Sequence, residues 1–235
     1  RLTDVTGVQT CALPICISDN VQALLDIRNR EVEEPDEADT AVFYSISNAQ
    51  AGLKGISFGN FLIKRVVNAL AQDFENIKTF VTLSPIPGFC AWMQKQLAER
   101  GTDLLLKTER KGLESVLDEP VEQAFPLMCK DQSLWYRNQK REKAIRAPLM
   151  RLCAVYLSEA KNGTNALDPV AHFHLSNGAS MERINWLADT SSKGFKQSAG
   201  MMINYLYKTS KIEKNHEAYS SGGKVQMSSG FKALL

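Results

Sequence analysis

A strand, a glycine-rich loop and an amphipathic helix succeed one another between residues 40 and 70. The run from Thr40 to Ile46 is rich in β-branched and aromatic residues, which predicts a strand. Three glycines follow, and then three apolar residues at four-residue spacing: Gly52, Gly55 and Gly59, then Leu62, Val66 and Leu70. The spacing predicts a helix with one apolar face, so the chain is expected to build a sheet covered by helices.

Further strands and helices extend this pattern toward the C-terminus. Lys78 to Leu83 predicts a second strand that runs into Ser84-Pro85-Ile86-Pro87-Gly88, where prolines end strand pairing. Residues 102–162 are charged and helical in pattern, and Met181 to Leu187 and Gly200 to Tyr207 predict two more strands. The fold class is therefore α/β (α+β), a mixed β-sheet flanked by helices with a helical insertion.

Composition excludes several classes of function. The chain has 235 residues with 28 basic and 26 acidic side chains, and without a block of one sign nucleic-acid binding is not expected. No stretch of about 18 apolar residues occurs, so no membrane partner is expected. Five cysteines are scattered without a CxxC pair, which predicts reduced thiols and a cytoplasmic protein.

The first sixteen residues differ in character from the rest. Residues 1–16 show no clear periodicity and resemble a translated sequencing adapter, so we predict a non-native leader and a domain over residues 17–235. The alternative is an ordinary N-terminal strand and loop.

The glycine-rich segment is a candidate phosphate-binding loop. Backbone amides at a helix N-terminus favour phosphate, but the segment Gln50 to Asn60 matches neither GxxxxGK[ST] nor GxGxxG. It is similar to the loop with which acetyltransferase-like folds hold the pyrophosphate of coenzyme A. A glycine turn that merely starts a helix is the alternative.

Ser84 and the pair His172 and His174 are the remaining candidates for chemistry. Ser84 lies in a rigid Pro-Gly turn after a strand, where a turn or capping role is the common alternative. Asp168 and Pro169 predict the start of the helix that carries both histidines, with the aspartate as its cap. Two residues apart on this helix, the two rings diverge by about 200°, so at most one faces a pocket. The segment also lacks the GxSxG elbow of serine hydrolases, so hydrolysis ranks lower.

Several segments together resemble the malonyl-CoA decarboxylase family, in order, over about residues 17–235. The matching segments are Phe-Tyr-Ser-Ile-Ser at 43–47, Gly-Leu-Lys-Gly-Ile-Ser-Phe-Gly-Asn at 52–60, Thr-Leu-Ser-Pro-Ile-Pro-Gly-Phe at 82–89, Asp-Pro-Val-Ala-His-Phe-His-Leu-Ser-Asn-Gly-Ala at 168–179, and Gly-Met-Met-Ile-Asn-Tyr-Leu-Tyr at 200–207. The resemblance implies an N-acetyltransferase-like catalytic domain that converts malonyl-CoA into acetyl-CoA and carbon dioxide.

The resemblance also implies roles for particular residues. Ser84 matches the family's proton acceptor and His174 its proton donor, while malonyl-CoA is bound by a loop that matches Lys54, Gly55, Ile56, Ser57, Phe58, Gly59 and Asn60. No metal or other cofactor is implied, and the full-length family protein is expected to form homo-oligomers. Family members carry a helical domain before this region, so the chain resembles an N-terminally truncated member.

The reaction suggests how these residues act. Decarboxylation leaves a thioester enolate, and we expect Ser84 to hydrogen-bond the carboxylate or enolate oxygen while His174, with an ordinary pKa of about 6.5, protonates the α-carbon. Further donor candidates are Asn177, Asn185, Tyr205 and Tyr207. Two alternatives stay open: a coenzyme A-dependent N-acyltransferase and an inactive coenzyme A-binding fragment.

Overall fold

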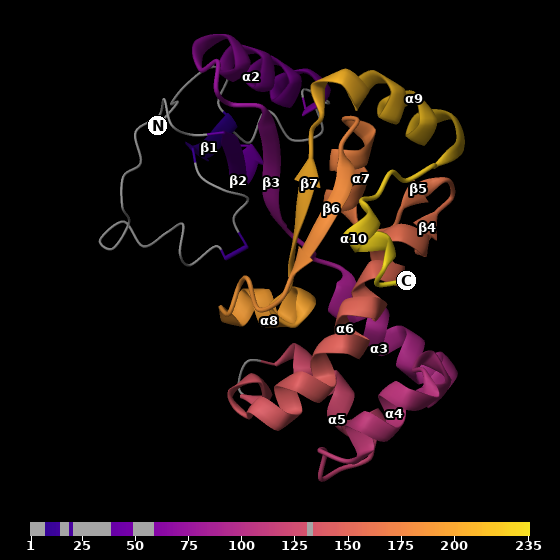
Figure 1. Ribbon diagram of the computed structural model, residues 1–235. Coiled ribbons are helices and arrows are strands. Elements are labelled where there is room, and N and C mark those ends of the chain that lie inside the picture. Colours follow the sequence, from indigo (N-terminus) through magenta and orange to yellow (C-terminus); the bar gives the residue numbers. More distant parts are fainter. Residues whose placement is uncertain (1–7, 15–18, 21–38, 49–58, 131–133) are drawn as a thin grey trace.

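A mixed five-stranded sheet forms the centre of the molecule (Figure 1). The computed structural model describes residues 8–14, 19–20, 39–48, 59–130 and 134–235. The strands run in the order β1-β2-β3-β7-β6, with bounds β1 Val8–Pro14, β2 Thr40–Asn48, β3 Thr79–Pro85, β6 Ser180–Asn185 and β7 Met202–Leu206. The four strands predicted from residues 40 onward are confirmed, and so is the fold class.

Helix α2, Gly59–Asp73, connects β2 to β3. These two strands pair in parallel, with Thr40 opposite Thr79 and Tyr44 opposite Leu83. Parallel neighbours require a crossover connection, usually a helix, and α2 provides it. The other pairs of the sheet are antiparallel.

Strand β1 includes part of the predicted leader. Val8 to Pro14 pairs antiparallel with β2, and the register shifts between Gln9 and Cys11. Residues 1–7 and 15–16 of the leader lie outside the described residues. That residues 1–16 are non-native stays a prediction.

The predicted helical insertion is confirmed between β3 and a small hairpin formed by β4, Lys161–Asn162, and β5, Asn165–Ala166. Its helices gather at one end of the molecule, opposite the end where α2 and α9, Ile212–Gly222, lie (Figure 1). Their bounds are α3 Phe89–Arg100, η3 Gly101–Leu104, α4 Lys107–Glu114, α5 Val121–Ala124, η4 Phe125–Cys129, η6 Trp135–Arg137 and α6 Gln139–Glu159.

The C-terminal part alternates helices with the last two sheet strands. The elements are β4 Lys161–Asn162, β5 Asn165–Ala166, α7 Pro169–Ser176, α8 Ser192–Ser198, η7 Thr209–Lys211, α9 Ile212–Gly222 and α10 Ser229–Lys232. Helix α7 precedes β6, and α8 connects β6 to β7. The chain from Gln226 to Ser228 then hydrogen-bonds Met181 of β6.

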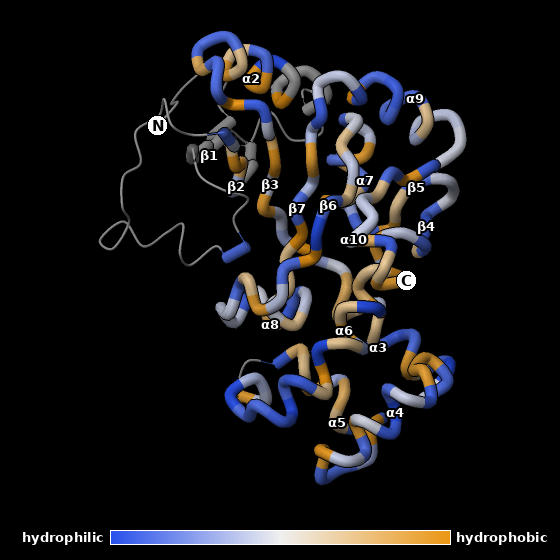
Figure 2. Tube along the Cα trace, viewed as in Figure 1, coloured by the Kyte–Doolittle hydropathy of each residue, from blue (hydrophilic) through white to orange (hydrophobic). Residues whose placement is uncertain are grey.

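The sheet buries residues on both faces. Because successive strand residues point to opposite faces, Phe80 of β3 and Ile203 of β7 face the large core that also contains Leu175 of α7. A smaller cluster on the other face includes Val42, Val81, Leu83 and Met202. The hydropathy colouring agrees with burial on both faces: β3 is mostly apolar, whereas polar and apolar residues alternate along α2 (Figure 2).

The buried face of α2 is made partly by residues one position further along the chain than predicted. Ile63, Val67 and Leu70 are buried, and Val66 is only half-buried. Leu62, which the prediction placed on the apolar face, has a side chain outside the described ones. Spacings of three and four residues both keep a helix face, so the alternative set of apolar residues fits the helical period equally well.

The prediction that the cysteines are unpaired is wrong for two of them. Cys90 of α3 and Cys129 of η4 form a disulfide, with Cα atoms 6.0 Å apart. Cys153 is free and buried. The insertion folds back on its first helix, α3, and brings together two cysteines 39 residues apart. Spacing along the chain does not reveal such a contact.

Candidate active site

Ser84 lies at the C-terminal end of β3, in the sequence Ser-Pro-Ile-Pro-Gly. Its side chain is 4% exposed and faces the large core, on the same face as Thr82 and Phe80. Pro85 ends the strand and Gly88 immediately precedes α3. The serine hydroxyl is therefore fixed between a central strand and a rigid turn.

His174 lies on the short helix α7. Asp168 is the N-cap of this helix and accepts hydrogen bonds from the amides of Val170 and Ala171, both at 3.0 Å, and Pro169 occupies the first helical position. This confirms the helix start expected from the Asp-Pro pair. His174 is 2% exposed, and its ring points toward the sheet.

The structure brings Ser84 and His174 together across 90 residues of sequence. Ser84 Oγ lies 3.0 Å from His174 Nε2, a hydrogen-bond distance, and both side chains are buried. A hydroxyl next to an imidazole is the arrangement needed for general acid–base chemistry. Both residues were predicted from the sequence, whereas their contact becomes visible only in the folded structure.

Thr82 is a further partner of this pair that the prediction missed. The hydroxyl of Ser84 donates to Thr82 Oγ1 at 2.9 Å, and the backbone amide of Tyr205 donates to the same oxygen at 3.2 Å. Since residues two apart in a strand share a face, Thr82 could have been named from its spacing to Ser84. It ties the serine to the neighbouring strand β7.

Two tyrosines hold the other side of the imidazole: Tyr205 in β7 and Tyr207 directly after this strand. Tyr207 Oη lies 2.8 Å from His174 Nδ1, and the ring of Tyr205 stacks on the imidazole with centroids 4.4 Å apart. Both tyrosines are buried. The two tyrosines, two residues apart, thus orient the ring by a hydrogen bond and by stacking.

Burial lowers the pKa of His174 to about 3. Burial away from solvent disfavours a charged imidazole, so the ring is neutral at neutral pH. The expectation of an ordinary pKa near 6.5 is therefore wrong for the free protein. With Ser84 donating to Thr82, Nε2 donates its hydrogen to Ser84 and Nδ1 accepts from Tyr207.

His172 does not share the site. Its Nδ1 lies 2.9 Å from the hydroxyl of Tyr219 on α9, and it is half-buried. The prediction that the two histidines of α7 point in different directions is confirmed, and only His174 contacts Ser84.

The predicted coenzyme loop is largely outside the described residues. Lys54, Gly55, Ile56, Ser57 and Phe58 fall there, whereas Gly59 and Asn60 begin α2. Their assignment to coenzyme A therefore stays a prediction.

The two candidate asparagines have structural partners. Asn185 donates to Asn204 Oδ1 at 2.7 Å, and Asn204 donates to the carbonyl of Thr82 at 2.8 Å. Asn177 ends α7 and donates to the carbonyl of Phe173. Among the described residues, Asn177 Oδ1 and Tyr205 Oη are buried without a hydrogen-bond partner.

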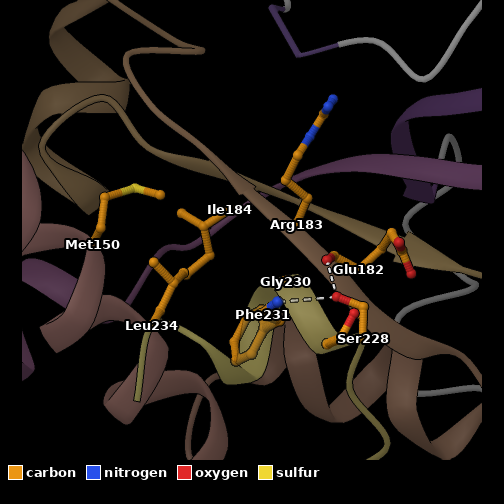
Figure 3. A pocket seen from close by; sticks show the side chains of 9 residues that line it. Met150, Glu182, Arg183, Ile184, Ser228, Gly230, Phe231 and Leu234 are labelled. Carbon is orange, nitrogen blue, oxygen red and sulfur yellow. Dashed lines mark hydrogen bonds between the residues drawn. The ribbon is translucent and has the colours of Figure 1, made fainter.

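A surface hollow lies elsewhere, between β6, α6 and α10 (Figure 3). Ile184, Phe231 and Leu234 form its apolar side, and Ser228 connects α10 to β6 by donating to the carbonyl of Glu182. Neither Ser84 nor His174 lines it. The hollow is thus separate from the buried serine–histidine pair.

The described residues show neither a cluster of metal ligands nor a membrane-spanning helix. Within the described part of the chain, no group of three or more His, Cys, Asp or Glu side chains is arranged to hold a metal ion. No helix in the same part is long and apolar enough to cross a membrane.

Fold and site together define an α/β protein with a buried acid–base pair placed by a central strand and a short helix. Comparison with known proteins narrows the class. The family described as the malonyl-CoA decarboxylase C-terminal domain matches residues 8–235. The chain belongs to this family.

Named relatives agree with the family match. The chain is 42% identical over 214 residues to the mitochondrial malonyl-CoA decarboxylase of Anser anser anser, covering 88% of this chain and 42% of that protein. With the mitochondrial enzyme of Rattus norvegicus, 40% identity extends over 225 residues, which is 93% of this chain and 46% of the relative. The chain thus spans less than half the length of these relatives.

Solved structures of the family have the same fold. The crystal structure of malonyl-CoA decarboxylase from Rhodopseudomonas palustris matches with a TM-score of 0.80 and 39% identity, over 97% of this chain and 48% of that one. The enzyme from Agrobacterium vitis matches with a TM-score of 0.81 and 41% identity, over 97% and 52% of the two chains. The similarity therefore covers nearly all of the present chain.

Proposed function

We propose that this chain carries the catalytic site of a malonyl-CoA decarboxylase, a carboxy-lyase that converts malonyl-CoA into acetyl-CoA and carbon dioxide. The observation that carries the proposal is the buried contact of 3.0 Å between Ser84 Oγ and His174 Nε2. It is made by the two residues that the family resemblance assigns to the reaction. The names of the goose and rat relatives support the same activity.

The chemistry requires charge to be stabilised at one oxygen. The bond between the carboxylate carbon and the α-carbon breaks, carbon dioxide leaves, and the electron pair passes into a thioester enolate. A fixed donor near the enolate oxygen stabilises this charge best in a site without water. Ser84 supplies the donor by turning its hydrogen from Thr82 toward the malonyl carboxylate or the enolate oxygen.

His174 then delivers a proton to the α-carbon, which completes acetyl-CoA. In the free protein the low pKa keeps the ring neutral. A malonyl carboxylate bound beside the ring favours the charged form and raises this pKa. The imidazolium donates from Nε2 to the α-carbon, while Nδ1 donates to Tyr207 Oη. One proton is consumed per turnover, as the overall reaction requires.

The remaining assignments extend the proposal. The loop formed by Lys54 to Asn60 holds the coenzyme A moiety, and its backbone amides suit phosphate oxygens. No metal or other cofactor takes part, and the full-length protein forms homo-oligomers. We place the protein in the cytoplasm; the goose and rat relatives are named mitochondrial, and cell fractionation would decide between the two locations.

The test is release of carbon dioxide and acetyl-CoA from malonyl-CoA by the parent chain and three variants. Ser84→Ala and His174→Asn are expected to lower turnover by about 10² to 10⁴-fold. His172→Asn is the matched control, because His172 lies on the same helix but contacts Tyr219 instead of Ser84, and its turnover should stay near that of the parent.

The outcomes separate the alternatives. Near-parental turnover of Ser84→Ala or His174→Asn would show that the assigned role is wrong. Acyl transfer to an added amine without decarboxylation would support the acyltransferase, and binding of coenzyme A by a folded but inactive parent would support the fragment.

A further inference from the structure

Asp168 connects three segments that surround the serine–histidine pair. Its Oδ1 accepts from the amides of Val170 and Ala171 at the start of α7. Its Oδ2 accepts from the amide of Gly88 at 3.3 Å and from the hydroxyl of Tyr156 on α6 at 3.1 Å. The carboxylate, 1% exposed, therefore joins α7, α6 and the turn that follows Ser84.

We propose that Asp168 is the positioning residue of the active site, which sets the distance between Ser84 and His174 without contacting either reacting group. The inference rests on the proposed function for its effect on turnover. Its structural part, the placement of the histidine ring against the serine, can be measured without any activity.

The connection is short on both sides. Gly88 follows Ser84 by four residues, and Pro85 and Pro87 restrict the backbone between them. On the other side, His174 lies on the same eight-residue helix that Asp168 caps. Movement of the carboxylate would thus shift the serine turn relative to α7.

The glycine at position 88 is explained by this contact. A Cβ at residue 88 would lie 2.0 Å from Tyr156 Oη and 3.2 Å from Tyr156 Cζ. The backbone there has φ −100° and ψ −9°, a conformation open to any residue. Glycine is therefore required by the close approach of Tyr156 to Asp168, and the backbone angles do not demand it.

Burial shifts the pKa values of both Asp168 and Tyr156. Burial raises the pKa of Asp168, opposed by its hydrogen bonds to Ala171, Gly88, Tyr156 and Val170. Burial and the nearby carboxylate of Asp168 both raise the pKa of Tyr156. An asparagine at position 168 would remove the buried charge and keep an oxygen for the cap of α7. This substitution therefore tests the positioning role while the helix cap, which the fold needs, is kept.

Asp168→Asn is the decisive variant. The amide oxygen can still accept from Val170 and Ala171, but the amide nitrogen cannot accept from Gly88. We expect cooperative unfolding at a midpoint close to that of the parent, an unchanged KM for malonyl-CoA and a fall in kcat of up to about 100-fold, the cost of an ångström-scale misplacement. Tyr156→Phe removes one of the two Oδ2 donors and should lower kcat less.

Tyr219→Phe is the matched control. It removes a buried tyrosine hydroxyl that also contacts α7, through His172, and accepts from the amide of Ala166. It should leave kcat unchanged. A general loss of packing under α7 would lower kcat in this variant as well and would overturn the proposal.

A second readout is the ¹⁵N NMR spectrum of the His174 imidazole, which reports the tautomer and the hydrogen bond from Nε2. Asp168→Asn should alter the Nε2 signal, and Tyr219→Phe should not. A parental kcat and a parental His174 spectrum in Asp168→Asn would overturn the proposal. If the parent chain does not decarboxylate malonyl-CoA, the proposed function fails, and the imidazole signal still decides the positioning role.

Gly88→Ala provides an independent route if Asp168→Asn does not fold. The added methyl displaces the hydroxyl of Tyr156, so kcat and the Nε2 signal should change as in Asp168→Asn. In the double variant with Tyr156→Phe the obstructing hydroxyl is absent, and part of the loss should be recovered. Absence of any change in Gly88→Ala would refute the positioning role.

Discussion

Protonation of His174 should make the stability of the fold depend on pH in a defined window. The folded pKa is about 3, lowered by burial from the ordinary value of 6.5. Between these values the unfolded chain binds a proton at this residue and the folded protein does not. The contribution of His174 to stability is therefore fully present above about pH 6.5 and is lost as pH falls toward about 3.

The magnitude follows from the difference between the two pKa values. Each pKa unit corresponds to about 1.4 kcal/mol, so the free energy of unfolding changes by about 5 kcal/mol across the whole window. Marginal stabilities are about 5–15 kcal/mol, so acidification alone would threaten the fold. The slope between about pH 4.5 and 6 is the accessible measurement.

Urea unfolding of the parent and of His174→Asn at closely spaced pH values isolates this term. Carboxylates titrate in the same range in both proteins, so only the difference between the two curves is interpreted. The parent should lose about 1.4 kcal/mol more than the variant for each pH unit on acidification, and the difference should level off above about pH 6.5. Parallel curves would refute the conclusion that the imidazole is buried and neutral.

Two further predictions concern stability. Arg151→Ala should lower the free energy of unfolding by about 3–5 kcal/mol, because Arg151 makes two hydrogen bonds of 2.7 Å to the Glu109 carboxylate at side-chain exposures of 17% and 10%. In urea unfolding, Arg110→Ala, which removes an exposed ion pair with Glu114, should have a much smaller effect, and equal effects of the two substitutions would contradict this. Gly178→Ala should lower the thermal midpoint, at a cost of about 1–3 kcal/mol for its positive φ alone, since φ is +81° and a Cβ would lie 2.2 Å from the carbonyl oxygen of Ile212. Gly112→Ala is the comparison, because nothing lies within 4 Å of a Cβ at this position. A gain in stability of up to about 1 kcal/mol is expected there. A loss of stability in Gly112→Ala would contradict the explanation of the Gly178→Ala effect by the contact with Ile212.

Much of the fold could be predicted because its signals are local. The β-branched runs at residues 40–46 and 78–83 determine two neighbouring strands, and the helix between them follows from apolar spacing. The Asp-Pro start of α7 is equally local. Such features depend on residues within one turn or one strand, and sequence patterns describe these well.

Features that depend on packing could not be predicted in the same way. The pKa of His174 depends on burial beneath β7, and the Cys90–Cys129 disulfide depends on how the insertion folds back. Asp168 was correctly predicted as a helix cap, yet its second oxygen faces Gly88 and Tyr156 from other elements. A cap is visible in the sequence, whereas a contact between three elements is not.

The hydrogen bonds around Ser84 explain why Thr82 matters to the proposed reaction. A hydroxyl has one hydrogen to donate and two lone pairs that accept. At rest, Ser84 donates to Thr82 and accepts from Nε2 of His174, so its hydrogen is already used.

To donate to a substrate oxygen, Ser84 must accept from both neighbours. Thr82 makes this change by turning its own hydrogen toward Ser84 while its oxygen keeps accepting from the amide of Tyr205. The rearrangement moves hydroxyl hydrogens but no heavy atoms, so the donor can respond to substrate while β3 and α7 stay fixed. A rigid site of this kind stabilises developing charge with little reorganisation.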